Sequence, residues 1–224
     1  MAPRVTPWFR ERPEALAALR ADLGARYPQL HAFEIDDRVV VRGTVALVDG
    51  DREVDRYELE IGLPDDYTKS SSTVHETAGR IPRIAARHVN PDSSLCLGVP
   101  DALWLQFGAM SLIQLLDGPV RSFLAGNTLV EAGQPWPHGE WDHGTDGMLQ
   151  FYAEQFGTTD TALLLNMLAL LNQTQPKWQK PCPCRSGRKL RDCHAATLRR
   201  LRDRIPAAVR SKTLTAVRTV RAAK

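Results

Sequence analysis

Residues 38–61, RVVVRGTVALVDGDREVDRYELEI, decide the fold class of this chain. Within them, Arg38–Val48 and Asp55–Ile61 carry apolar residues at alternate positions, a period of two that is typical of strands with one buried face. Asp49-Gly50-Asp51 between the two stretches is a hairpin turn signal. The sequence therefore predicts an antiparallel hairpin whose buried face holds Val39, Val41, Val45, Tyr57, Leu59 and Ile61.

The segments on either side extend this hairpin into a larger sheet with a helix before it. His31–Ile35 is strand-like, and Ser72–Thr77 is a shorter candidate for a fourth strand. Residues 11–26 place leucines on one helical face, and Pro13 suits the first turn of a helix. We therefore expect an N-terminal helix followed by an antiparallel four-stranded meander.

Three further helices are expected after the sheet, at Met110–Leu124, Gly147–Phe156 and Thr161–Leu171. The last of them contains ALLLNMLALL, which is apolar on nearly all sides and belongs either to a core or to an oligomer contact. An N-terminal helix, a four-stranded meander and C-terminal helices together indicate an α+β fold.

Charge divides the chain into two predicted domains. Residues 1–176 contain 14 basic and 24 acidic side chains, whereas residues 177–224 contain 15 basic and 2 acidic ones. A polar, proline-containing stretch at 173–179 separates them, so we place one domain at 1–173 and a second at 174–224. The basic tail is either a solvated surface that docks on the acidic domain or a contact for nucleic acid or an acidic protein.

The composition is that of a soluble globular protein, with 224 residues of which 43% are hydrophobic and 25% charged. No apolar run approaches the roughly 18 to 20 residues that cross a bilayer, so we expect no membrane contact. The first twenty residues lack the apolar core of a signal peptide, which predicts a cytoplasmic protein. Glycine-rich phosphate-binding motifs are absent, and we expect no nucleotide cofactor.

Three of the four cysteines lie within twelve residues and are followed by a histidine. Cys182 and Cys184 form one pair, Cys193 and His194 form another, and an eight-residue loop with Ser186-Gly187 separates them. Three thiolates and one imidazole make a tetrahedral donor set that zinc prefers. Nearby basic residues favour the deprotonated thiols. Because four protein ligands leave no open position, we expect Zn²⁺ to be structural here.

This segment resembles the SEC-C motif, Cys-x-Cys-x-Ser-Gly followed by a Cys-Cys or Cys-His pair, and matches it at every position between residues 182 and 194. The resemblance implies a zinc-binding accessory module that recruits partners or clients. A disulfide in an oxidising compartment and a chance cluster are the alternative interpretations. The tail beyond the motif predicts two basic amphipathic helices that are separated near Pro206.

The fourth cysteine, Cys96, has a different setting. A cysteine flanked by leucines is most often buried and inert. Here, however, His88 and Asn90 precede it in the segment RHVNPDSSLCLG, whose Pro, Asp and Ser content is typical of a loop. Since catalytic residues are often carried on loops of a rigid scaffold, this segment is a candidate active site.

The order of these features resembles the ubiquitin-conjugating enzymes. That family has an N-terminal helix, a four-stranded meander, a Phe-Pro-x-x-Tyr-Pro turn, His-Pro-Asn, a nucleophile within Ile-Cys-Leu, and a later tryptophan. This chain has Leu63-Pro-Asp-Asp-Tyr67, His88-Val-Asn90, Leu95-Cys96-Leu97 and Trp104 in the same order. The resemblance covers about residues 10–125 and implies a ubiquitin-conjugating-like (UBC-like) domain.

Two departures from the family pattern are typical of its divergent bacterial relatives. Valine occupies the proline position of His-Pro-Asn, and the interval from Asn90 to Cys96 is two residues shorter than in eukaryotic members. Such relatives occur in antiviral operons. By resemblance, the expected partner is a protein with a C-terminal acyl group, either ubiquitin-like or a cGAS-like nucleotidyltransferase, with or without an activating enzyme.

The chemistry that the resemblance implies is thioester transfer at Cys96. Its thiolate attacks a thioester carbonyl, and an amine, usually from lysine, then attacks the new thioester. Asn90 is the implied donor to the oxyanion in both steps. His88 is expected to brace the loop by hydrogen bonding, because a thioester needs no strong general base.

Other functions fit parts of the same sequence. Cys96 could be an inert core residue, or an inactive fold could serve as an adaptor that bridges partners through the zinc module. A Cys-His hydrolase would use His88, His138 or His143, the last two from the Trp-, His- and Gly-rich segment 133–147. A nucleic-acid-binding protein would use the basic tail.

Overall fold

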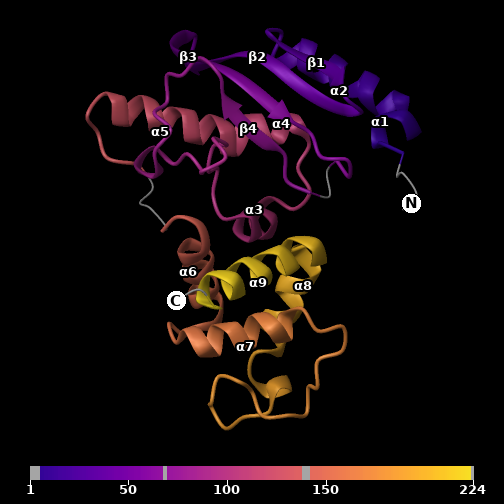
Figure 1. Cartoon of the computed structure of the whole chain (residues 1–224), viewed down its shortest axis with the longest axis vertical. Coiled ribbons are helices and arrows are strands. Elements are labelled where there is room, and N and C mark those ends of the chain that lie inside the picture. Colours follow the sequence, from indigo (N-terminus) through magenta and orange to yellow (C-terminus); the bar gives the residue numbers. More distant parts are fainter. Residues whose placement is uncertain (1–5, 68–69, 138–141, 223–224) are drawn as a thin grey trace. The chain divides into compact units, whose positions relative to one another are not determined.

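The computed structural model describes residues 6–67, 70–137 and 142–222 (Figure 1). The chain divides into two compact units, and each buries a hydrophobic cluster of its own. The first unit consists of Met1–Leu97 and Ala109–Gly139, and the second consists of Gly98–Gly108 and Glu140–Lys224.

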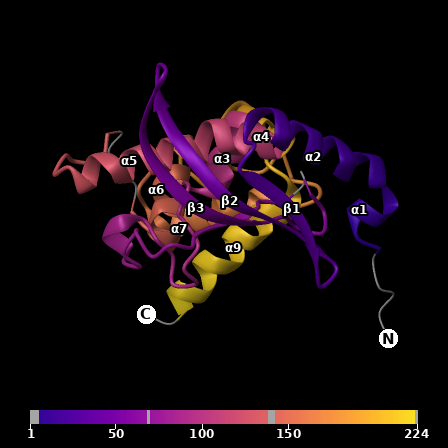
Figure 2. The same ribbon diagram turned by 90° about the horizontal axis from the view of Figure 1, so that it is seen from above.

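The first unit begins with helices and continues into an antiparallel sheet. The strand order β1-β2-β3-β4 follows the chain order, which is a four-stranded meander. Figure 2 shows β2 and β3 as long strands that run side by side. The predicted α+β class and the predicted meander are therefore confirmed. The elements are α1 (Trp8–Glu11), α2 (Pro13–Arg26), β1 (Leu30–Ile35), β2 (Arg38–Asp49), β3 (Arg52–Gly62) and β4 (Thr73–Glu76).

The central hairpin follows the predicted alternation of apolar residues. Val41 pairs with Ile61 and Val45 pairs with Tyr57, and each of these side chains is at most 2% exposed. Burying one such side chain contributes about 1.5 to 3 kcal/mol. At the turn, Gly50 has φ 58°, a left-handed conformation that a residue without Cβ adopts at little cost.

A helical run in the first unit packs against this sheet. It consists of α4 (Leu112–Leu115), the π-helical segment η2 (Leu116–Val120) and α5 (Arg121–Glu131). The expected helix ended at Leu124, but the run continues to Glu131. Pro119 lies inside η2, and its missing N–H is accommodated there by the wider turn, so the helix continues past it.

The second unit is built from helices around one core. Both α6 and α7 pack against α9, and α7 also packs against α8. The predicted helix at Thr161–Leu171 is confirmed as α7. Its N-cap residue Asp160 accepts hydrogen bonds from the amides of Ala162 and Leu163. The elements are α3 (Pro100–Phe107), α6 (Gly144–Phe156), α7, η3 (Leu190–Asp192), α8 (Ala195–Arg204) and α9 (Ala207–Ala222).

These units differ from the predicted domains 1–173 and 174–224. Helices α6 and α7 belong with the basic tail because their apolar residues, such as Phe156 and Met167, share a cluster with Leu198 and Leu201. The change of net charge near residue 176 is a property of the surface, and it does not mark the end of a core. The two compact units divide at residue 139, and Gly98–Gly108 also belong to the second unit.

Candidate functional site

Cys182, Cys184, Cys193 and His194 converge in the second unit, and their ligand atoms all lie within 4.8 Å of one another. The Nδ1 atom of His194 is 3.3 Å from the Sγ of Cys182 and 3.3 Å from that of Cys193. The Sγ atoms of Cys184 and Cys193 are 3.5 Å apart. With bonds of about 2.3 Å to sulfur and 2.0–2.1 Å to nitrogen, the corners of a tetrahedral zinc site lie roughly 3.5 to 3.8 Å apart. These four residues, the Cys/His cluster, therefore fit one zinc ion.

The backbone of residues 180–190 forms a small hairpin that carries the first ligand pair. The amide of Cys182 donates to the carbonyl of Arg188 at 2.8 Å. The turn passes through Gly187 at φ 74°, which explains the glycine after Ser186. The second ligand pair lies at the junction between η3 and α8. Local backbone geometry thus brings the two pairs together.

Groups around the Cys/His cluster orient its ligands. The Nε2 atom of His194 lies 3.2 Å from the carbonyl oxygen of Phe156, so it carries the proton and leaves Nδ1 free to bind a metal. The hydroxyl of Ser186 lies 3.2 Å from the Sγ of Cys184 and 3.4 Å from that of Cys193. A hydroxyl in this position stabilises thiolate ligands by hydrogen bonding.

The two cysteines of the first pair differ in acidity. Burial raises the pKa of the Cys182 thiol to about 12. Burial acts in the same direction on Cys184, but hydrogen bonds with Ser186, Cys182 and Cys193 together outweigh it and lower the pKa of that thiol. Zinc binds cysteine as the thiolate, so any proton still held by these thiols is released when a metal binds.

The Cys/His cluster is part of the core of the second unit. Cys182 is 4% exposed and Leu190 is 2% exposed, and both belong to the hydrophobic cluster that contains Leu198 and Leu201 of α8. A metal ion held here would tie the small hairpin to α8. It would also close the coordination shell with protein atoms, which is the arrangement of a structural site.

Cys96 belongs to a different hairpin, residues 88–96 of the first unit, which follows η1 (Ala85–Arg87). Val89 and Leu95 bridge across this hairpin, and both are buried. Because side chains alternate across a strand, the residues on either side of this pair point the other way. Val89 and Leu95 therefore anchor one face of the hairpin in the core of the first unit. Its opposite face is left to the side chains of the neighbouring residues.

That other face holds the predicted residues His88, Asn90 and Cys96 together with Ser94. The amide of Cys96 donates to the carbonyl of His88 at 2.8 Å, and the amide of Asn90 donates to that of Ser94 at 2.8 Å. A ring nitrogen of His88 and the Sγ of Cys96 lie within 4.8 Å of each other. The side-chain amide of Asn90 donates to the hydroxyl of Ser94 at 3.0 Å.

A tight turn spans the short interval between Asn90 and Cys96. The amide of Ser93 donates to the carbonyl of Asn90 at 2.9 Å, and Ser93 has φ 67°. This is the pattern of a three-residue hairpin loop that ends in a left-handed residue. The carboxylate of Asp92 accepts from the hydroxyl and the amide of Ser94, and these bonds lower the pKa of Asp92. The turn is thus fixed by its own polar groups.

His88 is held in an uncommon conformation by its surroundings. Its φ of 52° lies in the left-handed region, which few residues other than glycine adopt. Its ring stands edge-on to the indole of Trp136, with ring centroids 4.4 Å apart. A Cβ on Gly126 of α5 would lie 2.2 Å from that indole, so only glycine leaves room for it. The position of His88 therefore depends on α5.

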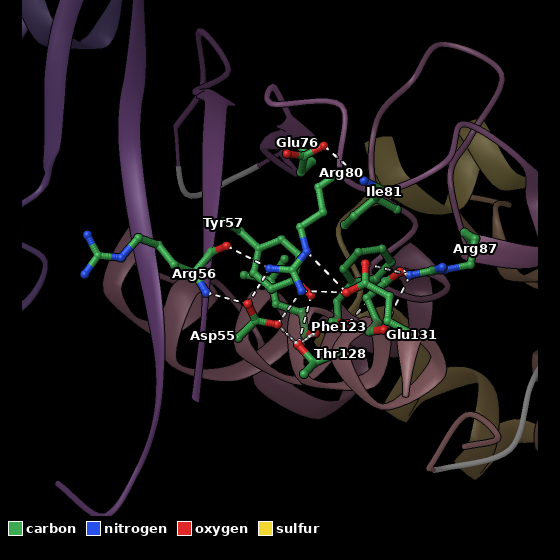
Figure 3. A network of polar contacts seen from close by, with 12 residues as sticks. Asp55, Arg56, Tyr57, Glu76, Arg80, Ile81, Arg87, Phe123, Thr128 and Glu131 are labelled. Carbon is green, nitrogen blue, oxygen red and sulfur yellow. Dashed lines mark hydrogen bonds and ion pairs between the residues drawn. The ribbon is translucent and has the colours of Figure 1, made fainter. Parts of the chain in front are cut away.

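Arg87, the residue before His88, ties the start of the hairpin to the same helix (Figure 3). Its Nε donates to the side-chain oxygen of Asn127 at 2.9 Å, and its guanidinium lies 3.3 Å from the carboxylate of Glu131. Asn127 is 0% exposed, so this bond is shielded from water. A charged group bonded in such a setting is worth about 1.5 to 3 kcal/mol.

The polar contacts continue from α5 to the sheet. Figure 3 shows Arg80 between Asp55 of β3 and Glu131. Its Nη2 donates to a carboxylate oxygen of Asp55 at 2.6 Å and to one of Glu131 at 2.5 Å. The hydroxyl of Thr128 also donates to Asp55 at 2.6 Å. The bond from Arg80 is the largest cause that holds the pKa of Asp55 well below its ordinary value. We call Asp55, Arg80, Arg87, Asn127, Thr128 and Glu131 the α5 brace.

No sequence pattern indicates the α5 brace, because its partners are separated by 25 to 73 residues along the chain. The sequence also gives no sign that a carboxylate is buried in the core of the second unit. Asp101 is 0% exposed and accepts hydrogen bonds from Tyr152 at 2.6 Å and Thr213 at 2.5 Å. Burial raises the pKa of Asp101, and these bonds oppose the rise. This carboxylate joins α3, α6 and α9 within the core.

The histidine of the hydrolase interpretation that lies in the second unit, His143, is the N-cap residue of α6. His138 lies outside the described residues, as does Trp141. None of the helices within the described part of the chain is long and apolar enough to cross a membrane.

The fold and the Cys/His cluster define an α+β protein with a site that fits a zinc-binding module. A family model described as the SEC-C motif matches residues 180–196, which include all four members of the cluster. Comparison with curated proteins and with solved structures gives no match.

Proposed function

We propose that this protein is a cysteine-dependent acyl carrier and transferase that resembles ubiquitin-conjugating enzymes, with Cys96 as its nucleophile. The observation that carries the proposal is the hairpin 88–96, which presents His88, Asn90 and Cys96 on one face. Further support comes from the elements before it, an N-terminal helix and a four-stranded antiparallel meander in the order of that family.

The proposed reaction has two displacement steps at a carbonyl carbon. In the first, the thiolate of Cys96 forms a new C–S bond to the acyl group, and the donor leaves as a thiolate that takes up a proton. In the second, the amine of an acceptor forms a C–N bond, the thiolate of Cys96 leaves, and the amine loses a proton to solvent. Both steps pass through a tetrahedral oxyanion.

Asn90 and His88 have separate roles in this proposal. The amide of Asn90, which donates to Ser94 in the free protein, would turn to donate to the oxyanion. Removing such a donor typically costs about 10² to 10³ in rate. His88 acts as a positioning residue, because its ring packs on Trp136 and its carbonyl accepts the amide of Cys96.

The proposed partners follow from the same resemblance. The donor would be a protein with a C-terminal acyl group, either ubiquitin-like or a cGAS-like nucleotidyltransferase, charged by an activating enzyme where one is needed. The Cys/His cluster would hold a structural zinc ion in the second unit. Both the zinc thiolates and Cys96 need to stay reduced, which suits the cytoplasm.

The proposal is tested by incubating the protein with ATP, Mg²⁺ and the products of neighbouring genes. We expect a covalent adduct on Cys96 that thiols remove. Cys96→Ser should give a thiol-resistant ester or no adduct, and Cys96→Ala should give none. Asn90→Ala should slow transfer by about 10² to 10³. Ser93→Gly, which keeps the left-handed turn conformation, is the matched control and should leave the rate unchanged.

A negative result points to a different class of protein. If no partner set yields an adduct and Cys96→Ala keeps full activity in cells, the transferase proposal is rejected. The remaining interpretations would then be a non-catalytic adaptor that bridges partners and a nucleic-acid-binding protein.

A further inference from the structure

The second unit carries an unusual concentration of positive charge beside the Cys/His cluster. Residues 177–191 contain six basic side chains and no acidic one. Every one of the six is exposed, and they are Lys177, Lys180, Arg185, Arg188, Lys189 and Arg191. Protein surfaces ordinarily mix charges of both signs, so such a segment favours an anionic partner.

Part of this charge surrounds a tryptophan. The amide of Arg191 donates to the carbonyl of Trp178 at 3.0 Å, and the amide of Lys180 donates to that of Lys177, also at 3.0 Å. From α8, the guanidinium of Arg199 lies 5.0 Å from the centre of the indole ring. Trp178 itself is only half-buried. We call Lys177, Trp178, Lys180, Arg191 and Arg199 the Trp178 patch.

Acidic neighbours neutralise little of this charge. Arg191 lies 3.2 Å from Asp192, but both side chains are about half exposed, at 48% and 56%, so solvent screens the pair. Among the ion pairs within the described ranges, none involves Lys177, Lys180 or Arg199. These cations are therefore available to bind an anion without first breaking a pair.

We propose that the Trp178 patch binds single-stranded nucleic acid. Lysine and arginine side chains contact phosphates regardless of sequence, while an indole or a guanidinium plane stacks on an unpaired base. Both kinds of group occur together here, because Arg199 already lies over the indole of Trp178. An acidic peptide would use only the cations, and a duplex keeps its bases stacked inside, so a single strand uses more of this surface.

The inference does not depend on the chemistry of Cys96, which belongs to the other unit. The Cys/His cluster supports the patch, since the hairpin 180–190 joins Lys180 to the first ligand pair. Loss of metal should therefore loosen the patch as well. The proposal adds a binding site to the protein whether or not Cys96 carries an acyl group.

Fluorescence anisotropy of the full-length, zinc-loaded protein tests the proposal with labelled oligouridine, oligothymidine and a duplex of equal length. Both single strands should bind more tightly than the duplex, and the comparison of the two shows whether RNA or DNA is preferred. Affinity should fall with salt. Four neutralised phosphates predict a slope of about −3 in log K against log salt, at about −0.7 for each.

Charge reversal locates the binding surface. The double variant Lys180→Glu and Arg191→Glu should weaken single-strand binding by at least about tenfold and make the salt slope shallower. The matched control is Lys212→Glu with Arg218→Glu, which reverses two exposed cations on α9 and should change binding little. Zinc content and helical circular dichroism should be equal in all three proteins.

Several outcomes would overturn the proposal. Equal losses in both double variants would show that binding reflects the total charge of the unit and not the Trp178 patch. Tighter binding of the duplex, no binding of any oligonucleotide at low salt, or tighter binding of polyglutamate than of oligouridine would each reject a single-strand site. The last result would assign the patch to an acidic protein.

Discussion

The Cys/His cluster and the Cys96 hairpin differ in where their support comes from. The four ligands of the cluster lie between residues 182 and 194, and the geometry that brings them together is almost entirely local. The hairpin 88–96 is shorter still, but its position depends on α5 and the sheet, through side chains up to 73 residues apart. A local site can be recognised by its spacing alone, whereas a site supported from a distance cannot.

The Cys/His cluster and the Cys96 hairpin should also differ in the free energy that their supporting interactions contribute to stability. A structural zinc site in a small peptide contributes about 10 to 16 kcal/mol at neutral pH. Each hydrogen bond of the α5 brace contributes about 1 to 3 kcal/mol. Removing the zinc ion should therefore unfold the whole second unit. Removing one hydrogen bond of the α5 brace should loosen only the hairpin 88–96. Three experiments follow, in order of expected effect.

Removal of the metal should have the largest effect. Chelation, or Cys193→Ser, is expected to abolish hydrogen-exchange protection in α8 and α9, because the cluster lies in the core of the second unit. Amides of β2 and β3 in the first unit should stay protected. Metal analysis should give about one zinc equivalent for the wild type and none for the variant.

The matched control for this experiment is Cys96→Ser, which makes the same chemical change at a cysteine outside the cluster. It should keep both the zinc ion and the protection of α8 and α9. If Cys193→Ser also keeps that protection, the second unit folds without metal, and the cluster is not a structural site.

The features that the sequence predicts correctly are those whose residues lie close together along the chain. The alternation of apolar residues on both sides of Gly50 predicts the central hairpin. A strand that buries only one face carries an apolar residue at every second position. The motif from Cys182 to His194 predicted the ligand set, since metal spacing is fixed by bond lengths and tight turns. All the residues that form each pattern lie within one short, continuous segment of the sequence.

Long-range packing set the limit of what could be predicted. Charge predicts a domain boundary near residue 173, but the core of the second unit is decided by which apolar faces meet, so α6 shares a unit with α8 and α9. Likewise, nothing near Arg87 in the sequence marks Asn127 as its partner. The sequence alone points to His88, Asn90 and Cys96, whereas the side chains that hold them in place are seen only in the fold.

Removing one member of the α5 brace should have the second-largest effect. Asn127→Ala deletes the buried acceptor of Arg87 and should lower the free energy of unfolding by about 2 to 3 kcal/mol. Beyond that global loss, the amides of Asn90 and Cys96 should exchange faster, because the hairpin loses its tie to α5. Hydrogen exchange with mass spectrometry measures both effects.

The control for this variant is Leu129→Ala, a truncation on the same helix at a side chain that is 40% exposed. It should cost less than about 1 kcal/mol and leave the exchange of the hairpin unchanged. Equal exchange at residues 88–96 in the two variants would contradict the role given to the brace.

The smallest effect should come from the charge at the far end of the brace, and it should depend on pH. The folded pKa of Asp55 is held below its ordinary value, chiefly by Arg80, so its contribution is present above the unfolded pKa of about 3.9. Asp55→Asn should therefore cost about 1 to 2 kcal/mol at neutral pH. The difference should begin to shrink as the pH falls below about 4, where the carboxylate of the unfolded chain gains its proton, and it should vanish only as the pH falls through the lower folded pKa.

Unfolding in urea, followed through the protected amides of β2 and β3, gives this difference without interference from zinc release in the second unit. Asp51→Asn, at an exposed turn residue of the same hairpin, should show almost no loss at any pH. A loss at Asp55 that stays constant between pH 7 and acid conditions would mean that its shape and hydrogen bonds, and not its charge, hold the sheet to the brace. The contact between β3 and α5 would then depend on packing and neutral hydrogen bonds across the fold, and not on an ion pair.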